Sequence, residues 1–389
     1  MADKPYSLLL GNPPTSAEIG FIADATPLAQ GWRRSIRARG GPWLGSFRII
    51  ADENLMTKWF NEYLFYTLRE MYKGKTTWKG VIWEMTYTHR GVARKKSMDD
   101  IANAVWAYYL DNNGVVQETS VATSTQSIAR YGRMENIILM DNYPQAAAEQ
   151  RRDKTLAELA WPWARPVGGG GSANSYLDVS TAGMIFTANN QYTTATDDAT
   201  GNANAWVTNI ITDDMEFFST GKIETNTLQV KRTLDTPARA FDVLMDIVNL
   251  GGTGNAPWEL FAGETANGAN TLNYRAINTD PIYYLIRNQL TTVDGSQQSV
   301  APWAVQPGVV RDLEYPVRSP DYGSWLDTAA DMYLEEVTAS DRGITWETEN
   351  YSESALLAAQ QDYALMLANM KYEKQPPTLA NTKYVQSNE

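Results

Sequence analysis

The chain has 389 residues, of which 43% are hydrophobic and 20% are charged, and its formal net charge is −12. This length predicts two or three domains with a sizeable core, and the composition excludes a disordered or collagen-like chain. No apolar run approaches the ~18–20 residues that a membrane helix needs, so we expect neither a membrane span nor a signal peptide.

The supply of reactive side chains narrows the chemistry further. The sequence contains no Cys and a single His, His89. The lack of Cys excludes disulfides, iron–sulfur clusters, thiolate zinc sites and cysteine nucleophiles. A single His leaves few side chains that could act as a general base near neutral pH. We therefore expect no cofactor, no metal and no enzymatic activity, and we place His89 at a strand end in a surface or turn role.

Charge is distributed unevenly along the chain. Through Ser172 there are 21 Lys and Arg against 17 Asp and Glu, whereas the remainder has 12 against 28. This split favours association between unlike surfaces and argues against binding of nucleic acid by the second half, because phosphate binding needs a positive field. The alternative is that the charge only keeps the surface soluble.

The segment before residue 168 predicts mostly strands with a few helices. Alternating residues over 31–38 and 43–50, joined by an Arg-Gly-Gly-Pro turn, predict a β-hairpin. Asp52 is placed to cap a helix that carries Leu55, Trp59 and Phe60 on one face. Further strands are expected over 67–72, 81–89, 102–110 and 115–120, and helices over 124–132 and 142–159.

A Gly-rich stretch, 168–172, marks the strongest domain boundary, whether it is natural or engineered. Strands are expected beyond it over 176–187, 217–230, 271–277, 282–285, 332–338 and 344–348. Helices are expected over 237–249 and 353–371. The sequence thus predicts an α+β or mainly β chain, with a barrel or sandwich before the boundary and without βαβ alternation.

Two groups of side chains permit a binding or catalytic interpretation. Acidic pairs such as Asp213-Asp214 and Glu335-Glu336 supply carboxylates for glycoside hydrolysis, but adjacent residues on a strand point to opposite faces. The aromatic residues are rich in Trp and Tyr, which suits either a sugar-stacking platform or a packed core and interface. The tryptophans considered for these roles are Trp32, Trp43, Trp78, Trp83 and Trp106, for which we favour core or interface packing.

Five segments together resemble the tail hub proteins of tailed bacteriophages. They are Trp78–Met85 (WKGVIWEM), Ser97–Tyr109 (SMDDIANAVWAYY), Ser127–Glu135 (SIARYGRME), Val305–Arg311 (VQPGVVR) and Met332–Val337 (MYLEEV). The last two resemble the strands with which the chain of such a hub comes back to its barrels after the central region. The resemblance touches both halves of the chain and leaves 174–270 without a counterpart.

The resemblance implies an α+β, mainly β fold with two tail-tube-like β-barrels, inserted α/β elements and a C-terminal helix. It places a first barrel with a helical crossover in 1–167, a central α/β insertion in 173–300, and the returning strands of the second barrel with the helix in 301–389. Three copies would form a ring at the tail tip or baseplate of the virion. A sixfold ring of a tail adaptor, tube or distal tail protein is one alternative, and a glycan- or receptor-binding tail protein is another.

The implied partners are further copies of the chain, a tail tube or distal tail protein, and a tip, spike or fibre protein. Genomic DNA would pass through the ring without specific binding, and carboxylates lining the channel would repel it. No residue is expected to be catalytic. The residues expected at a subunit interface are Arg33, Arg34, Arg37 and Arg39 of the hairpin, with Trp83 and Trp106 as packing residues.

Overall fold

The computed structural model describes residues 4–16, 20–111, 113–141, 143–168, 174–193, 200–231, 237–252, 256–287, 289–294, 296, 298–313, 331–340 and 343–349. Its largest element is a 14-stranded sheet in which β2, β1, β5, β6, β13, β4, β3, β24, β23, β21 and β22 follow one another. We call it the main sheet. It confirms the mainly β, α+β fold expected from the sequence.

The main sheet is built from strands of all three sequence segments. Most of its pairs are antiparallel, and β7 and β25 branch from β6 and β24. Its strands are β1 (Ser7–Gly11), β2 (Phe21–Asp24), β3 (Ala29–Arg37), β4 (Gly41–Ile49), β5 (Thr67–Tyr72), β6 (Lys75–His89), β7 (Val92–Ser97), β12 (Arg165–Val167), β13 (Tyr176–Gly183), β21 (Tyr283–Ile286), β22 (Gln289–Thr292), β23 (Gly308–Asp312), β24 (Asp331–Ser340) and β25 (Gly343–Glu349).

The pairing of β3 with β24 joins the two ends of the described chain. The register places Ile36 opposite Val337 and Arg37 opposite Glu336. Strands from both of the expected barrels therefore belong to one sheet, and the returning strands expected near residues 305–311 and 332–337 are β23 and β24. The three-part division of the chain itself stays a prediction.

One face of the main sheet is covered by the helix α1 (Glu53–Glu62), which begins where the sequence predicts. The Asp52 carboxylate accepts a hydrogen bond from the backbone N of Leu55 at 2.9 Å, which satisfies one of the free N–H groups of the first turn. Trp59 and Phe60 are buried against the sheet, and Trp59 meets Phe47 with ring centroids 6.1 Å apart. This aromatic layer is the core that holds α1 in place.

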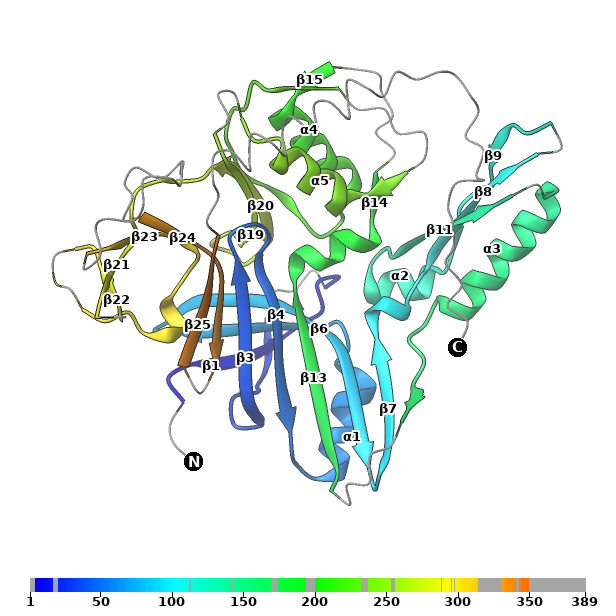
Figure 1. Cartoon of the computed structure of the whole chain (residues 1–389). Helices are drawn as coiled ribbons and strands as arrows, with labels where there is room; N and C mark the ends of the chain where they lie inside the picture. The colour runs from blue at the N-terminus through cyan, green and yellow to red at the C-terminus, as the bar shows by residue number, and fades with distance from the viewer. Residues whose placement is uncertain are drawn as a thin grey trace, which may run out of the picture.

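A second, smaller sheet stands beside the main sheet at the right of Figure 1. It comprises β8 (Ala104–Leu110), β9 (Val116–Glu118), β10 (Ala122–Thr123) and β11 (Glu135–Met140), with the helices α2 (Thr125–Tyr131) and α3 (Gln145–Leu159). We call residues 104–159 the small unit. Its strands β8 and β11 are parallel, with α2 between them in the chain.

The small unit contains one parallel crossover within a chain whose described part otherwise lacks the βαβ alternation excluded by the sequence. Parallel neighbours need a crossover connection, and α2 lies within it. The strand β11 was not predicted, because Glu135–Met140 has no strict polar–apolar alternation: α3 covers one of its faces, and Leu139 on the other is exposed.

The region at the top of Figure 1 follows β13. It holds the 3₁₀ segment η2 (Met184–Asn190), α4 (Ala203–Asn209), the π-helical turn η3 (Ile210–Asp214), α5 (Ala240–Asn249) and short strands. These strands are β14 (Tyr192–Thr193), β15 (Thr200–Asn202), β16 (Ser219–Ile223), β17 (Gln229–Lys231), β18 (Ala238–Arg239), β19 (Trp258–Glu264) and β20 (Asn270–Ala276).

The strand expected over 217–230 is interrupted by Asn226. Its side chain donates to the Gly251 carbonyl at 2.9 Å and accepts from the backbone N of Leu228 at 3.0 Å. This local turn separates β16 from β17. The strand expected over 176–187 ends at Gly183, where the backbone continues as η2. The helix expected over 353–371 lies outside the described residues, as does most of the Gly-rich stretch.

None of the described helices is both long and apolar enough to span a membrane.

Candidate functional site

The arginines expected at an interface lie on and just after β3, and they differ in their surroundings. Arg34 is fully buried, and its Nε lies 3.3 Å from the Glu70 carboxylate. Burial lowers the pKa of Arg34, and the negative charge of Glu70 acts against that shift. Because Arg34 has no exposed surface in the single chain, its assignment to a subunit interface is corrected: it belongs to the internal structure.

Glu70 is the centre of this buried cluster. It accepts hydrogen bonds from Trp32 Nε1 and from Thr77 Oγ1, each at 2.5 Å, while Arg34 donates to the carbonyl of Trp303 at 3.0 Å. Trp303 belongs to the short helix η4 (Pro302–Ala304), far along the chain. The cluster thus ties the N-terminal strands to the returning C-terminal segment.

The other three hairpin arginines lie nearer to solvent. Arg37 pairs with Glu336 of β24 at 2.7 Å and stacks over the Trp43 ring at 4.3 Å. Arg39 donates to the Asn249 side chain at 2.9 Å. Arg33 is exposed and has no side-chain partner in the described part of the chain. A role for Arg33, Arg37 and Arg39 at a subunit interface stays a prediction.

The two tryptophans named with them pack inside the chain. The Trp83 indole donates to Asp99 at 2.9 Å and its ring lies 6.2 Å from that of Phe186. Trp106 is 4% exposed and meets the Tyr192 ring at 6.0 Å. Trp32 and Trp78 are fully buried, so these residues form a core rather than an exposed platform for sugars.

The face of the main sheet opposite α1 is open and polar. The register places Asp178 of β13 between Arg48 of β4 and Thr86 of β6, and Thr86 opposite Lys95 of β7. A neighbouring row runs through side chains of the same polar kind. Its members are Ser97, Glu84, Ser180, Ser46 and Arg33. We call this surface the open face.

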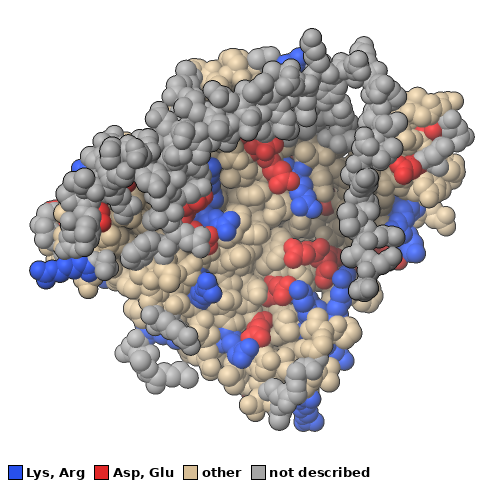
Figure 2. Space-filling model, in the orientation of Figure 1, with Lys and Arg blue, Asp and Glu red and all other residues tan. Residues whose placement is uncertain are grey.

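Charges on the open face are paired across neighbouring strands. Arg48 contacts both oxygens of Asp178, at 2.6 and 3.0 Å, and Lys95 lies 2.5 Å from Glu84. Figure 2 is viewed from the same side as Figure 1 and shows blue and red surfaces next to one another over these strands. The open face is therefore a mosaic of both signs of charge.

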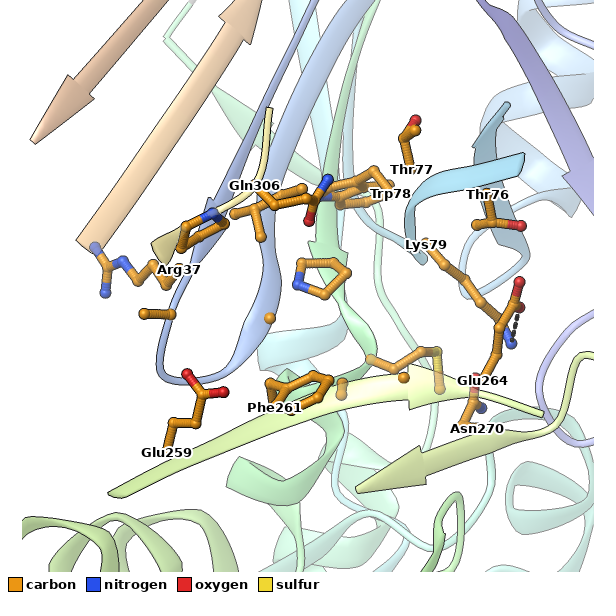
Figure 3. Close-up of a pocket in the computed structure, with 18 of the residues that line it drawn as sticks. Arg37, Thr76, Thr77, Trp78, Lys79, Glu259, Phe261, Glu264, Asn270 and Gln306 are labelled. Atoms are coloured by element: carbon orange, nitrogen blue, oxygen red, sulfur yellow. Dashed lines mark ion pairs between the residues drawn. The ribbon is translucent and has the colours of Figure 1, made fainter. Parts of the chain in front are cut away.

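A cavity of about 350 Å³ lies where the β3–β4 turn, the first half of β6 and the β19–β20 hairpin meet (Figure 3). Lys79 enters from β6 and Glu264 from β19, with 3.4 Å between their charged atoms. Burial and the nearby Arg69 lower the pKa of Lys79 to about 8, and Glu264 acts against that shift.

The other charged groups around this cavity are also paired. Arg275 contacts Glu259 at 2.6 Å, and burial raises the pKa of that carboxyl while Arg275 opposes the shift. Lys79 and Arg69 both donate to the carbonyl of Gly268 at the end of the hairpin, at 2.7 and 3.2 Å. These contacts dock the β19–β20 hairpin onto the main sheet.

A second hollow, of about 690 Å³, lies between the small unit and η3. We call it the acidic cleft. Five carboxylates and one arginine line it, together with apolar and aromatic side chains. The charged members are Glu118, Glu135, Asp213, Asp214, Glu216 and Arg133. From the sequence, Asp213 and Asp214 are candidates only for a catalytic pair. Nothing in the sequence indicates that they lie close to acidic residues of β9 and β11.

Among the described residues, no group of three or more His, Asp or Glu side chains is placed to hold a metal ion. His89 lies at the end of β6, with its Nδ1 at 3.0 Å from Ser175 Oγ and its Nε2 at 3.6 Å from Glu53. Its position at a strand end agrees with the sequence.

Comparison with known proteins gives few matches. No protein-family model matches the chain, and no curated protein matches it. A solved tail protein from Neisseria meningitidis MC58 is similar, with 7% identity and a TM-score of 0.41, over 89% of this chain and 96% of that one. The 43 kDa tail protein of prophage MuSo2 from Shewanella oneidensis has 7% identity and a TM-score of 0.37, over 89% and 97%. TM-scores in this range do not establish a common fold.

Proposed function

We propose that the chain is a structural protein of a phage tail: a hub of the tail tip or baseplate, three copies of which form a ring around the passage for DNA. The open face is the observation that carries the proposal. It spans five neighbouring strands, β7, β6, β13, β4 and β3, and keeps polar side chains where the opposite face is packed with α1.

A sheet face of this kind suits the wall of a water-filled passage. Ser46, Ser180 and Arg33 are exposed, and the two exposed apolar side chains on this face of β4 and just beyond it, Leu44 and Ile50, are separated by Ser46 and Arg48. Arg48 and Lys95 are each paired with a carboxylate, which leaves Arg33 as the unpaired cation among the residues named for the open face. A polyanion passing the surface therefore meets only a weak positive field. The acidic wall expected from the sequence is not a property of this face, whose charges are mixed.

Within the same proposal, one rim of the ring contacts a tail tube or distal tail protein and the other a tip, spike or fibre protein. The exposed edges of the main sheet suit such contacts, since an edge strand presents unpaired backbone groups. β2 is one such edge, with Phe21 56% and Ile22 44% exposed.

The first test is native mass spectrometry of the purified chain over a concentration series, with negative-stain class averages of the oligomer. A ring of three chains with a central hole supports the hub, and a ring of six favours a tube or adaptor protein. A chain that stays monomeric at every concentration contradicts assembly without partners. A glycan array then tests the binding alternative, for which the exposed Trp161 and Trp163 are the available rings.

The position of the open face is tested on the same ring. The chain has no Cys, so S180C gives a single thiol on the open face and V293C a control thiol at the turn just after β22. A gold cluster attached to S180C should appear at the central hole in class averages, and one on V293C away from it. Gold on S180C at the outer rim would remove the channel from the proposal and leave the ring.

A further inference from the structure

The turn between β6 and β7 exposes two arginines that the rest of the chain does not use. Arg90 and Gly91 form a two-residue connection between His89 and Val92, with φ angles of +48° and +82°. Such turns favour Asn-Gly or Gly-Gly, because a side chain at positive φ is strained. The turn nevertheless holds an exposed arginine in this conformation.

The surroundings of this turn make it a protruding basic element. Arg90 and Arg94 are exposed and have no side-chain partner in the described ranges, and Val92 between them is 58% exposed. By contrast, Lys95 on the same strand pairs with Glu84. We call Arg90–Arg94 the basic tip.

The acidic cleft has the opposite character. Its one lining cation, Arg133, is bound to Glu135 at 2.6 Å, which leaves Asp213 and Asp214 without a cation among the lining residues. The pKa of Asp214 is raised, first by burial and further by the charges of Asp213 and Glu135, although a hydrogen bond from Thr193 opposes the shift. The field in the cleft is therefore negative and uncompensated.

A second feature of the cleft indicates a ligand with hydrogen-bond donors. Gln191 lines the cleft and is 2% exposed, yet its Oε1 has no hydrogen-bond partner in the described part of the chain. A buried amide oxygen without a donor is costly, and a guanidinium supplies several donors in one plane. Val121 and Phe218 add apolar wall on which a side chain such as Val92 can pack.

We propose that the basic tip of one copy seats in the acidic cleft of a second copy of this chain. The inference rests on the proposed assembly of the chain into a ring and names the surfaces that meet. In Figure 1 the turn between β6 and β7 lies at the bottom of the view, whereas α2 and β14, which border the cleft, lie above it. A chain cannot bring its own tip to its own cleft without unfolding, so the contact is intermolecular.

Because the tip and the cleft are different surfaces, the contact is heterologous, and successive copies are related by the same rotation. Such contacts build a closed ring when the rotation closes. Charge complementarity also gives direction, since a tip against a tip would set Arg90 against Arg90.

The test uses the absence of Cys. Two separate variants, V92C at the tip and V121C at the cleft, are mixed and oxidised, and V293C replaces V121C in the control because the two valines are similarly exposed, at 41% and 40%. We expect a covalent dimer from V92C with V121C, at least tenfold more abundant than from V92C with V293C. Equal yields would overturn the proposal.

Charge reversal provides the second arm. R90E/R94E and D213R/D214R should each weaken self-association at least tenfold, and a mixture of the two variants should recover association between unlike copies. A ring of three keeps one junction between like copies, so its closure should stay weakened in the mixture. Circular dichroism confirms that each variant is folded. A ring that forms without the V92C–V121C cross-link leaves the proposed function standing and removes this inference. If the V92C–V121C cross-link forms but the copies never close into a ring, this inference stands and the proposed ring is removed.

Discussion

The main sheet and the small unit differ in how their cores are made. The main sheet is packed around large, fully buried side chains, including Trp32, Trp78 and the ion-paired Arg34. In the small unit, the layer between β8, β11 and α3 buries mainly small residues with one ring, namely Ala107, Ala148 and Tyr109. The other buried rings of the unit, Trp106 and Tyr131, contact Tyr192 and Phe65 outside it. Only two residues of α3 are buried, although the helix is 15 residues long. The first region has a core of its own, and the second has little more than a contact layer.

The same contrast appears on the two surfaces. The open face of the main sheet carries paired charges, whereas the small unit exposes apolar side chains. These are Val115, Val116, Val121, Leu139 and Tyr143. Exposed apolar groups gathered on one unit indicate a surface that a partner covers. The main sheet therefore holds the fold and also carries the basic tip, whereas the small unit is expected to gain order from its neighbours.

Removing the centre of the buried cluster should break the stable region. In E70A, Arg34 becomes a buried charge without a carboxylate and keeps only the carbonyl of Trp303, while the side chains of Trp32 and Thr77 lose the Glu70 carboxylate as acceptor. We expect a loss of about 3–5 kcal/mol in the free energy of unfolding, measured by urea denaturation. The control E84Q opens a half-exposed pair and should cost less than about 1 kcal/mol. A loss in E70A no larger than in E84Q would show that the cluster does not hold the sheet.

Truncating the ring in the small core should separate the two regions. Y109A is expected to cost about 3 kcal/mol, because little else fills the space between β8 and α3. Hydrogen exchange should show lost protection over 104–159 and unchanged protection in β4, β6 and β13. The control V179A lies in the main core and should lower protection in both regions. If Y109A also lowers protection throughout the main sheet, the two regions are one cooperative unit.

A smaller effect is expected at the junction of the main sheet with the β19–β20 hairpin. The pKa of Lys79 is 10.5 in the unfolded chain and about 8 in the folded one. Between these pH values the unfolded chain binds a proton that the folded chain lacks, so this group makes stability rise with pH across the window. Below pH 8 the cost of burying the ammonium is fully present.

K79M should remove that dependence. The difference in the free energy of unfolding between wild type and K79M should move in favour of the wild type by on the order of 1–3 kcal/mol from pH 7.5 to 10.5. Urea titrations at several pH values measure it. K75M, at an exposed turn, serves as the control and should show a constant difference. A constant difference for K79M as well would place its ammonium in water.

The sequence predicts the local elements of the main sheet better than its connections. The hairpin β3–β4, β5 and the Asp52 cap follow from alternation and capping, which are local signals. The burial of Arg34 could not be predicted, because its partner Glu70 lies 36 residues away and Trp303 lies 269 away. Alternation places Arg34 on the same face of β3 as Trp32 and Ile36, but the hairpin contains no carboxylate that would let an arginine be buried there.

The acidic cleft could not be predicted from the sequence for a similar reason. Glu118 comes from β9, Glu135 from β11 and Asp213 from η3, and only tertiary packing brings them together. The basic tip carried a local signal, since Arg-Gly between two alternating runs is a tight-turn pattern. What the sequence could not give is that Arg90 and Arg94 stay unpaired while Lys95 does not.

A substitution on the exposed side of β11 should change assembly while leaving the stability of the single chain almost unchanged. Leu139 lies on β11, at the edge of the small sheet, and is 59% exposed. L139N therefore removes no packing in the single chain, and its free energy of unfolding should stay within about 0.5 kcal/mol of wild type. If neighbouring copies cover the small unit, L139N should weaken the oligomer. The variant should then need a higher protein concentration than the wild type to stay assembled, and native mass spectrometry over a concentration series measures this.

The matched control is L313N, at a leucine that is 44% exposed and lies outside the small unit. It should leave both stability and assembly unchanged. An L139N chain that assembles like L313N would mean that the apolar surface of the small unit faces solvent in the oligomer. In that case neighbouring copies could not compensate for the thin core of the small unit. The contacts that α3, β8 and β11 make within the single chain would then have to hold this unit by themselves.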